Sequence, residues 1–249
     1  MAAQRVALVT GASRNIGRAI ALALAKNGCA VACFGRDTAA LEETASLVRS
    51  AGGQSSIFVG DAKSNRSLEE FAQHAVAAHG GIDVVINNAG VLHAGRSEHV
   101  TAEAFTEDLQ VNLVSQFTLA RAAYASMKTR GGGVIVNIGS LSGAIAFPGM
   151  AAYCASKAGI GGLTRALAYD WAADNIRVVC VAPGYVKSDI SKDALADAHK
   201  RDWILRRIPL RRVAEPEEIG DFVAFMASDA ARFCTGETYY VDGGQRMAI

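Results

Sequence analysis

Paired cysteines of the kind that form disulfides or bind zinc are missing from this 249-residue sequence. The chain contains five cysteines, an odd number, and no two of them form a C-x-x-C pair. No H-E-x-x-H pattern occurs among its five histidines. This usage argues against a disulfide framework and a zinc site, so we expect no bound metal. Free thiols are typical of the reducing cytosol, where we expect this chain to work.

A strong excess of charge and a long apolar run are also absent. The 25 basic and 24 acidic residues give a net charge of +1, which favours neither nucleic acid nor an anionic membrane as a partner. No run of about 18 apolar residues could cross a membrane. The apolar part of the N-terminus is too short for a signal peptide. Because no linker, repeat or composition break interrupts the chain, we expect one domain over residues 1–249.

Short apolar, β-branched runs alternate with longer helical patterns along the chain. The expected strands are 5–10, 30–35, 56–60, 83–87, 133–138, 177–182 and 238–241, and the expected helices are 16–27, 38–51, 68–78, 102–129, 152–173 and 216–228. Continuous apolar runs suit strands that are covered on both faces, as in a parallel sheet. The alternation predicts a three-layer, doubly wound (Rossmann-type) α/β fold with about seven strands. Residues 186–209 lie outside it and are the candidate for a mobile lid.

A glycine-rich turn connects the first expected strand to the first expected helix. The turn residues with a candidate binding role are Gly11, Ser13, Arg14, Asn15, Ile16 and Gly17. Glycines let the backbone approach a pyrophosphate, and a helix N-terminus offers free N–H groups, so the turn predicts a dinucleotide site. Asn15 departs from an all-glycine turn, but Asn tolerates a positive φ angle well. An ordinary glycine-containing loop is the alternative.

The end of the second expected strand should distinguish NADP from NAD. An acidic residue there would bind the ribose 2′-hydroxyl of NAD, whereas this chain has Gly35 followed by Arg36. Arg36 and Arg14 would favour a 2′-phosphate through charge-assisted hydrogen bonds, so we expect NADP(H). Asp37 could instead indicate NAD, but it also stands where a helix needs an N-cap. Asp61 could bind the adenine amine or cap a loop.

Tyr153 and Lys157 form a Y-x-x-x-K pattern that places both side chains on one face of an expected helix. The pattern is weak alone, because such a pair can be purely structural. Ser140 and the segment Asn87–Gly90 follow two strands and should lie at one edge of a parallel sheet, where ligands bind. At roughly 4–6 Å and an effective dielectric constant near 20, a lysine would stabilise the phenolate by about 3–4 kcal/mol. We therefore expect a lowered pKa for Tyr153.

Together these motifs resemble the single-domain branch of the short-chain dehydrogenase/reductase family over essentially the whole chain. The residues that carry the resemblance are Thr10-Gly11 through Gly17, Asn87-Asn88-Ala89-Gly90, Asn112, Ser140, Tyr153, Lys157 and Pro183-Gly184. Within that family, Val241-Asp242-Gly243-Gly244, Pro209-Leu210-Arg211-Arg212 and Glu215-Pro216-Glu217-Glu218 are similar to the 3-oxoacyl-carrier-protein reductases.

The resemblance implies a role for each of these residues. Tyr153 would exchange a proton with the substrate oxygen, and Ser140 would bind that oxygen. Lys157 would also bind the nicotinamide ribose. Asn112 would hold a water that resupplies protons, although its amide could instead satisfy helix backbone groups. The other implied cofactor contacts are Ala62, Asn88, Ala89, Gly90, Pro183, Gly184, Val186 and Ser188.

An apolar and aromatic set of residues is expected around the substrate. The candidates are Leu92, His93, Ser142, Phe147, Met150, Tyr185 and Trp203, together with Ser140 and Tyr153. This mixture favours an acyl chain or a hydrophobic ketone over a charged sugar acid. A histidine at a position like His93 is more often an ordinary loop residue than a substrate ligand.

A basic cluster and two long expected helices raise the question of partners. The clustered arginines are Arg201, Arg206, Arg207, Arg211 and Arg212. They could attract an acyl carrier protein, or they could be solvated or paired between subunits. The resemblance also implies a homotetramer. Small residues on the helices expected at 102–129 and 152–173 could form its interface or pack on the chain's own sheet.

The sequence thus favours an NADP(H)-dependent enzyme that interconverts a ketone and a secondary alcohol, with a 3-oxoacyl thioester or hydrophobic ketone as substrate. One alternative is an alcohol, polyol or steroid dehydrogenase that uses NAD(P). Another is a cofactor-binding regulator without catalysis. The complete set of Ser140, Tyr153 and Lys157 argues against the regulator, which would have no need for all three.

Overall fold

The computed structural model describes residues 4–248, and its centre is a seven-stranded, wholly parallel sheet. The strands are β1 (Val6–Thr10), β2 (Ala30–Gly35), β3 (Ser55–Val59), β4 (Val84–Asn87), β5 (Gly133–Ile138), β6 (Ile176–Pro183) and β7 (Thr238–Val241), in the order β3-β2-β1-β4-β5-β6-β7. Every residue of β1, β2 and β4 is buried. Their continuous apolar runs therefore do mark strands that are covered on both faces.

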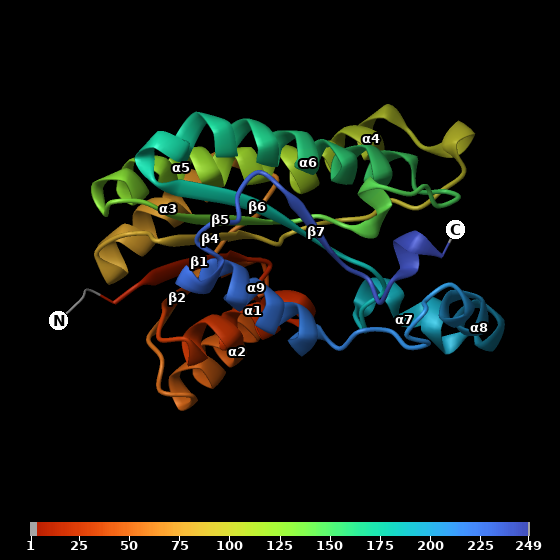
Figure 1. Cartoon of the computed structure of the whole chain (residues 1–249), viewed down its shortest axis with the longest axis horizontal. Helices are drawn as coiled ribbons and strands as arrows, with labels where there is room; N and C mark the ends of the chain where they lie inside the picture. The colour runs from red at the N-terminus through yellow and green to blue at the C-terminus, as the bar shows by residue number, and fades with distance from the viewer. Residues whose placement is uncertain (1–3, 249) are drawn as a thin grey trace.

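Helices cover the two faces of the sheet (Figure 1). One face carries α3 (Asn65–His79), α5 (Ser115–Thr129) and α6 (Ala151–Trp171), and the other carries α1 (Asn15–Lys26), α2 (Thr38–Ser50) and α9 (Pro216–Ala227). Each layer packs through its own apolar cluster, with Ile20, Leu24 and Val223 in one and Phe34, Phe71 and Leu119 in the other. The expected three-layer, doubly wound, single-domain fold is confirmed.

The expected helix over residues 102–129 is interrupted. The structure has α4 (Ala102–Leu109), a π-helical turn over Gln110–Val114 and then α5. A π-turn accommodates one extra residue, so the two halves of the segment do not share a regular helical register. Hydrophobic periodicity carries no signal for such an insertion, which is why the sequence predicted one continuous helix.

The segment that the sequence placed outside the alternation is helical. Residues 186–209 contain α7 (Asp189–Ala196) and α8 (Ala198–Arg206), which extend beyond the C-terminal ends of the strands in Figure 1. Between residues 4 and 248, no helix is long and apolar enough to cross a bilayer. Within the same range, no three His, Cys, Asp or Glu side chains are grouped so that they could bind a metal.

The strand order fixes where a ligand can bind. The chain runs outward from β1 to β3, then returns to β4 on the other side of β1. The connections that leave β1 and β4 therefore diverge at the carboxyl edge of the sheet. In open parallel sheets a ligand crevice forms at this reversal of strand order.

Candidate active site

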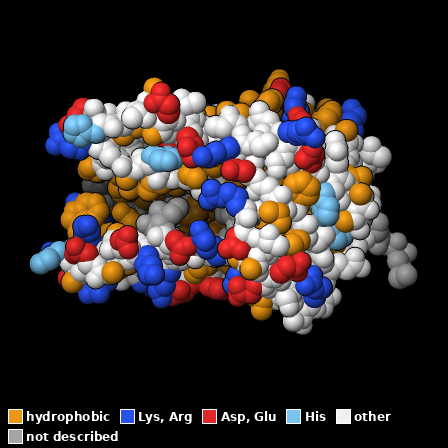
Figure 2. All heavy atoms as spheres, turned by 180° about the vertical axis from the view of Figure 1, so that it is seen from behind, with side chains coloured by type: hydrophobic (Ala, Val, Ile, Leu, Met, Phe, Trp, Pro, Cys, Tyr) orange, Lys and Arg blue, Asp and Glu red, His pale blue; other side chains and the backbone are white. Residues whose placement is uncertain are grey.

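A cleft of about 460 Å³ opens at the carboxyl edge of the sheet. Seen from behind, Figure 2 shows apolar side chains gathered in a hollow at the end of the molecule that carries α7 and α8, with charged side chains around its rim. The wall includes the glycine-rich turn, the ends of β4, β5 and β6, and residues of α7. Every cofactor contact expected from the sequence lies on this wall.

The glycine-rich turn is shaped for close approach to a ligand. Gly11 and Asn15 have φ angles of 65° and 48°, which confirms that Asn15 tolerates the left-handed region. A Cβ at Gly17 would overlap the carbonyl oxygen of Gly11, so no larger residue fits there. The turn leads into the N-terminus of α1, whose unpaired N–H groups favour a phosphate. The residues present therefore fit a pyrophosphate.

The segment after β4 is fixed to this turn by hydrogen bonds. Asn88 Nδ2 donates to the carbonyl oxygens of Thr10 and Gly11 at 2.9 and 3.2 Å. Thr10 Oγ1 accepts from the backbone N–H groups of Asn88 and Ala89 at 2.9 and 3.0 Å. The two loops thus form one rigid floor for the cleft.

The region expected to bind the 2′-phosphate contains both predicted arginines. Arg14 and Arg36 line the cleft, but Arg14 Nε also lies 2.7 Å from Asp189 Oδ2 on α7. Asp37 caps α2, accepting a hydrogen bond from Ala40 N at 3.1 Å, as its position in the sequence suggested. A Cβ at Gly35 would lie 2.6 Å from Ser13 Oγ, so an acidic side chain at that position would require the Ser13 hydroxyl to move.

The structure shows one of the two roles that the sequence left open for Asp61. It lines the cleft, and its Oδ1 accepts a hydrogen bond from Lys63 N at 2.9 Å in a tight turn. Its loop role is therefore shown, and a bond to an adenine amine stays a prediction.

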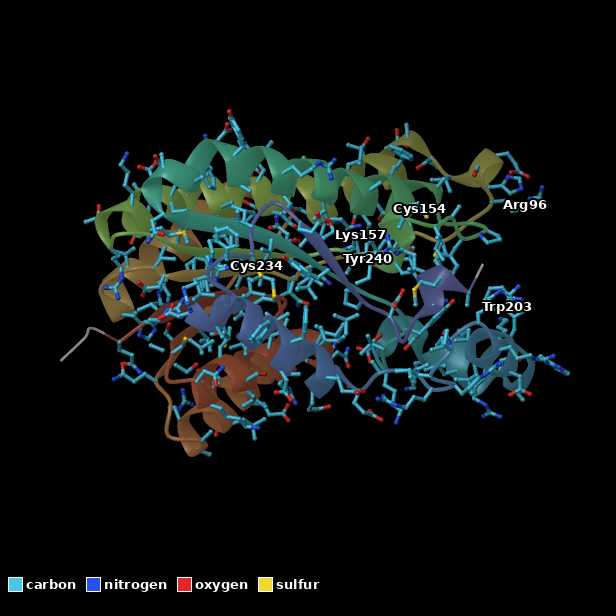
Figure 3. The ribbon with its side chains drawn as sticks, viewed as in Figure 1. Arg96, Cys154, Lys157, Trp203, Cys234 and Tyr240 are labelled. Carbon is cyan, nitrogen blue, oxygen red and sulfur yellow. The ribbon has the colours of Figure 1, made fainter. Side chains whose placement is uncertain are left out.

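Ser140, Tyr153 and Lys157 converge on the inner wall of the cleft. Ser140 follows β5, and its Oγ accepts a hydrogen bond from Ser142 N at 3.1 Å. The ammonium of Lys157 is buried, donates to the carbonyl of Ile138 at 2.9 Å, and lies 5.6 Å from the centre of the Tyr153 ring. Figure 3 shows Lys157 on the sheet side of α6, near the middle of the molecule. The spacing of four does place the pair together.

The pKa of Tyr153 is shifted in the direction opposite to the expectation. Burial raises the pKa of the Tyr153 phenol, and a hydrogen bond with Ser140 lowers it by less. Burial also lowers the pKa of Lys157, to about 8. The sequence argument allowed for a desolvation penalty but expected the attraction of Lys157 to outweigh it, whereas desolvation dominates in this site.

Asn112 lies behind the wall of the cleft, and its side-chain amide is already engaged. Its Oδ1 accepts from Val91 N at 2.8 Å, and its Nδ2 donates to Val91 O and Ser156 Oγ at 2.9 and 3.0 Å. Both amide hydrogens are therefore used. A water could bind only the remaining lone pair of Oδ1 or the main-chain carbonyl of Asn112.

The expected substrate residues separate into two groups. Seven of them line the cleft: Leu92, Ser140, Ser142, Phe147, Met150, Tyr153 and Tyr185. The rings of Phe147 and Tyr185 meet edge to face with their centres 6.3 Å apart. Trp203 and His93 are not on the wall. Trp203 belongs to α8 (Figure 3), and its ring stacks on the guanidinium of Arg207, which follows that helix. His93 turns towards Asp108.

Sequence reasoning missed three polar residues of the cleft: Lys63, Asp189 and Ser191. Lys63 directly follows Asp61 and Ala62 in one loop, so proximity in sequence could have indicated it. Asp189 and Ser191 belong to the N-terminal part of α7, a helix that the sequence did not reveal.

Comparison with known proteins agrees with this geometry. A sequence-family profile described as enoyl-(acyl carrier protein) reductase matches residues 11–246. The 3-oxoacyl-[acyl-carrier-protein] reductase FabG of Staphylococcus epidermidis is 36% identical over 242 residues, which cover 97% of this chain and 98% of that protein.

Two solved structures are also similar. One, from Sinorhizobium meliloti and provisionally described as a short-chain alcohol dehydrogenase, has a TM-score of 0.96 at 37% identity and covers 99% of this chain and 98% of that one. The other, from Beutenbergia cavernae, is provisionally described as an NAD(P)-dependent gluconate 5-dehydrogenase and holds NADP at low occupancy. It has a TM-score of 0.93 at 38% identity and covers 98% and 97% of the two chains. The chain therefore belongs to the short-chain dehydrogenase/reductase family and is an NADP(H)-dependent oxidoreductase that interconverts ketones and secondary alcohols.

Proposed function

We propose that Tyr153 is the acid/base of this oxidoreductase and that Ser140 and Lys157 complete its catalytic group. When bound, NADP(H) supplies or accepts a hydride at the substrate carbon. Negative charge then develops on the carbonyl oxygen, and the Tyr153 phenol donates the proton that neutralises it. The observation that carries this proposal is that the three side chains line the same cleft as the glycine-rich turn.

Ser140 and Lys157 have supporting roles in this proposal. The hydroxyl of Ser140 binds the substrate oxygen and orients it towards Tyr153. The ammonium of Lys157 holds the ribose hydroxyls and favours the phenolate electrostatically once the proton has left. Asn112 fixes the adjacent loop through Val91 and supports a proton-resupplying water through an oxygen rather than through its amide hydrogens.

The cofactor contacts follow from the positions on the wall. The turn from Gly11 to Gly17 holds the pyrophosphate at the N-terminus of α1. Arg36 and Arg14 hold the 2′-phosphate. The backbone after β4 and the segment Pro183–Ser188 border the nicotinamide half, and residues 186–209 act as a lid over it. Support for the lid comes from Asp189 and Ala194, which line the cleft from α7.

The substrate is a hydrophobic ketone, with a 3-oxoacyl thioester as the first candidate. The side chains near Tyr153 on the wall are mainly apolar or aromatic, with Leu92, Phe147, Met150 and Tyr185 among them. Of the other lysines and arginines on the described wall of the cleft, Arg14 and Arg36 are assigned to the 2′-phosphate, and Lys63 is paired with Glu107. This favours an acyl chain over gluconate, the substrate class named for one of the similar structures.

An acyl carrier protein is the partner we propose for α8 and the turn after it. Arg212 pairs with Glu218, whereas Arg206, Arg207 and Arg211 form no ion pair within residues 4–248. Such free cations could steer an acidic carrier towards the cleft.

We also propose a homotetramer that works in the cytosol. Exposed Phe117 on α5 and Tyr169 on α6 support a subunit interface on that face. The five free thiols support the compartment.

The test is oxidation of NADPH and NADH against a panel that contains a 3-oxoacyl thioester, a diketone and a gluconate-type ketone. Tyr153→Phe should reduce turnover at least 100-fold, because a general acid contributes about 10²–10⁴-fold. Its binding of NADPH, measured by fluorescence titration, should stay within about threefold of wild type. Loss of cofactor binding together with turnover would assign Tyr153 a structural role instead. If the enzyme reduced only the gluconate-type ketone, a sugar acid would replace the hydrophobic ketone as the proposed substrate class.

A further inference from the structure

A buried carboxylate stands behind the active site without a role in the steps above. Asp108 lies near the end of α4, and its side chain is fully buried. Among the described residues, only His93 hydrogen-bonds to it: Nδ1 lies 2.7 Å from Oδ1, and the backbone N–H lies 3.4 Å from Oδ2. A carboxylate removed from water is costly unless it is paired, so this contact is a requirement of the fold and not an incidental one.

Asp108 and Asn112 hold the same loop from one helical segment. They are four residues apart, and Asn112 binds the backbone of Val91 through both its N–H and its carbonyl. Asp108 binds His93, two residues further along the loop. In between, Leu92 lines the cleft. The helix therefore fixes residues on either side of Leu92, which sets how that side chain meets the substrate.

The Asp108–His93 pair also interacts electrostatically with the catalytic group. α4 packs against α6, which carries Tyr153, Cys154 and Lys157 (Figure 1). The negative charge of Asp108 raises the pKa of Tyr153 and also that of Lys157, although in each case burial is the larger cause.

On its outer side the pair meets other charged groups. His93 Nε2 lies 4.0 Å from Glu107 Oε1, and the same oxygen lies 2.5 Å from the ammonium of Lys63. The His93 side chain is 40% exposed, whereas that of Asp108 is 0% exposed. His93 therefore lies between the Lys63–Glu107 ion pair, which is partly exposed to solvent, and the buried carboxylate of Asp108.

We propose that Asp108 is a positioning residue for ketone reduction, which acts through His93 on the loop at Leu92 and places a negative charge on α4, the helix packed against the one that carries Tyr153. The inference rests on the proposed role of Tyr153 as the acid. It assigns two separable tasks. The shape of the loop depends on the hydrogen bonds to His93, and the electrostatic effect depends on the charge of Asp108.

Asp108→Asn removes the negative charge while its amide oxygen can still accept the shorter bond, from His93 Nδ1; only the longer bond from the His93 backbone N–H is lost. The measurement is kcat against pH for reduction with NADPH and for oxidation with NADP⁺. We expect the alkaline fall of reduction and the rise of oxidation both to move to lower pH by about half a pH unit or more. Glu103→Gln removes an exposed charge from the same helix and should leave both profiles unchanged. Identical profiles for Asp108→Asn and Glu103→Gln would overturn the proposal.

His93 variants test the loop independently of the charge. In His93→Asn the side-chain amide can replace Nδ1–H as a donor to Asp108, whereas His93→Ala cannot. We expect His93→Ala to raise the KM for the ketone at least threefold with less effect on kcat, and His93→Asn to restore most of it. Equal KM values for the two variants would contradict the loop role, and this comparison decides the matter if Asp108→Asn does not fold.

A spectroscopic titration separates this inference from the assigned activity. The phenolate absorbance of wild type minus that of Tyr153→Phe follows ionisation of Tyr153 without turnover. Asp108→Asn should lower the midpoint of this difference signal, and an unchanged midpoint would overturn the inference. If the midpoint moves but Tyr153→Phe retains full ketone reduction, the proposed function fails and the electrostatic coupling stands.

Discussion

Gly35 and Ser13 are in such close contact that a side chain at position 35 would have to displace the Ser13 hydroxyl. A Cβ at Gly35 would lie 2.6 Å from the Oγ of Ser13, well inside van der Waals contact. Position 35 is where an acidic residue would have to stand to bind the ribose hydroxyls of NAD. The packing of the glycine-rich turn against β2 therefore contributes to cofactor choice, in addition to the charge of Arg36.

Cofactor preference should change at position 36 and not at position 35. Arg36→Asp should lower the ratio of kcat/KM for NADPH over NADH by about 10–100-fold, since a charge-assisted hydrogen bond contributes roughly 1.5–3 kcal/mol. Gly35→Asp should weaken both cofactors and lower Tm, because the new side chain collides with Ser13. Steady-state kinetics with each cofactor check this, with Arg49→Asp on the exposed end of α2 as the control. A gain of NADH activity in Gly35→Asp would refute the steric argument.

The ion pair between Arg14 and Asp189 should compete with the cofactor. Both side chains are more than half exposed, so the pair itself contributes at most about 1 kcal/mol to stability. Asp189→Asn should bind NADPH a few-fold more tightly, because Arg14 is released to the 2′-phosphate, and should leave NADH affinity nearly unchanged. Fluorescence titration of both cofactors measures this. Weaker NADPH binding in Asp189→Asn would show instead that the carboxylate helps to close α7 over the cleft.

The burial of Lys157 should cost the protein stability. Its pKa falls from an ordinary 10.5 to about 8, which corresponds to roughly 3 kcal/mol. Lys157→Met should therefore be more stable at pH 7 by about 1–3 kcal/mol, after subtracting about 1 kcal/mol for the lost bond to Ile138, and it should be inactive. Denaturant titration measures the difference in free energy of unfolding.

The pH dependence of that difference has a definite sign. Below pH 8 Lys157 is charged in both folded and unfolded chains, so the full cost is present. Between pH 8 and pH 10.5 only the unfolded chain keeps the proton, and wild type gains stability as the pH rises. Above that window the amine is neutral in both states, and the advantage of Lys157→Met should disappear. An advantage that grows with pH would contradict the burial argument.

The two reaction directions should respond oppositely to pH. Burial raises the pKa of Tyr153 above its ordinary value of 10, so the phenol stays protonated through neutral pH. Reduction should therefore hold its rate up to alkaline pH, and alcohol oxidation, which needs the phenolate, should increase as pH rises. Initial rates in both directions from about pH 6 to about pH 11 check this. A reduction rate that falls already near neutral pH would mean that the bound cofactor and Lys157 outweigh burial.

Local sequence signals sufficed wherever one element alone fixes a residue's position. β2, β5 and β7 begin and end where the apolar runs predicted, and Asp37 caps α2 as its position suggested. The spacing of four between Tyr153 and Lys157 needs only a helix to bring them together. The parallel sheet that the sequence predicted accounts for the remaining site residues, because its strand order brings the ends of β1, β4 and β5 to one cleft.

Features that depend on packing between distant segments could not be read from the sequence. The pKa of Tyr153 was predicted with the wrong sign because burial is a property of the assembled fold. His93 turns away from the substrate because Asp108, 15 residues later, accepts its ring N–H. The partner of Arg14 lies on α7, 175 positions along the chain, and no local pattern connects the two.

The π-turn over Gln110–Val114 makes this part of the chain sensitive to its length. Removing one residue there would allow a regular α-helix to run from α4 into α5, because a π-turn takes up one extra residue while the helices on either side keep their orientation. Asp108 in α4 would then stay beside His93, whereas the turn that places Asn112 next to Val91 would be lost. A single-codon deletion would therefore separate the role of Asn112 from that of Asp108.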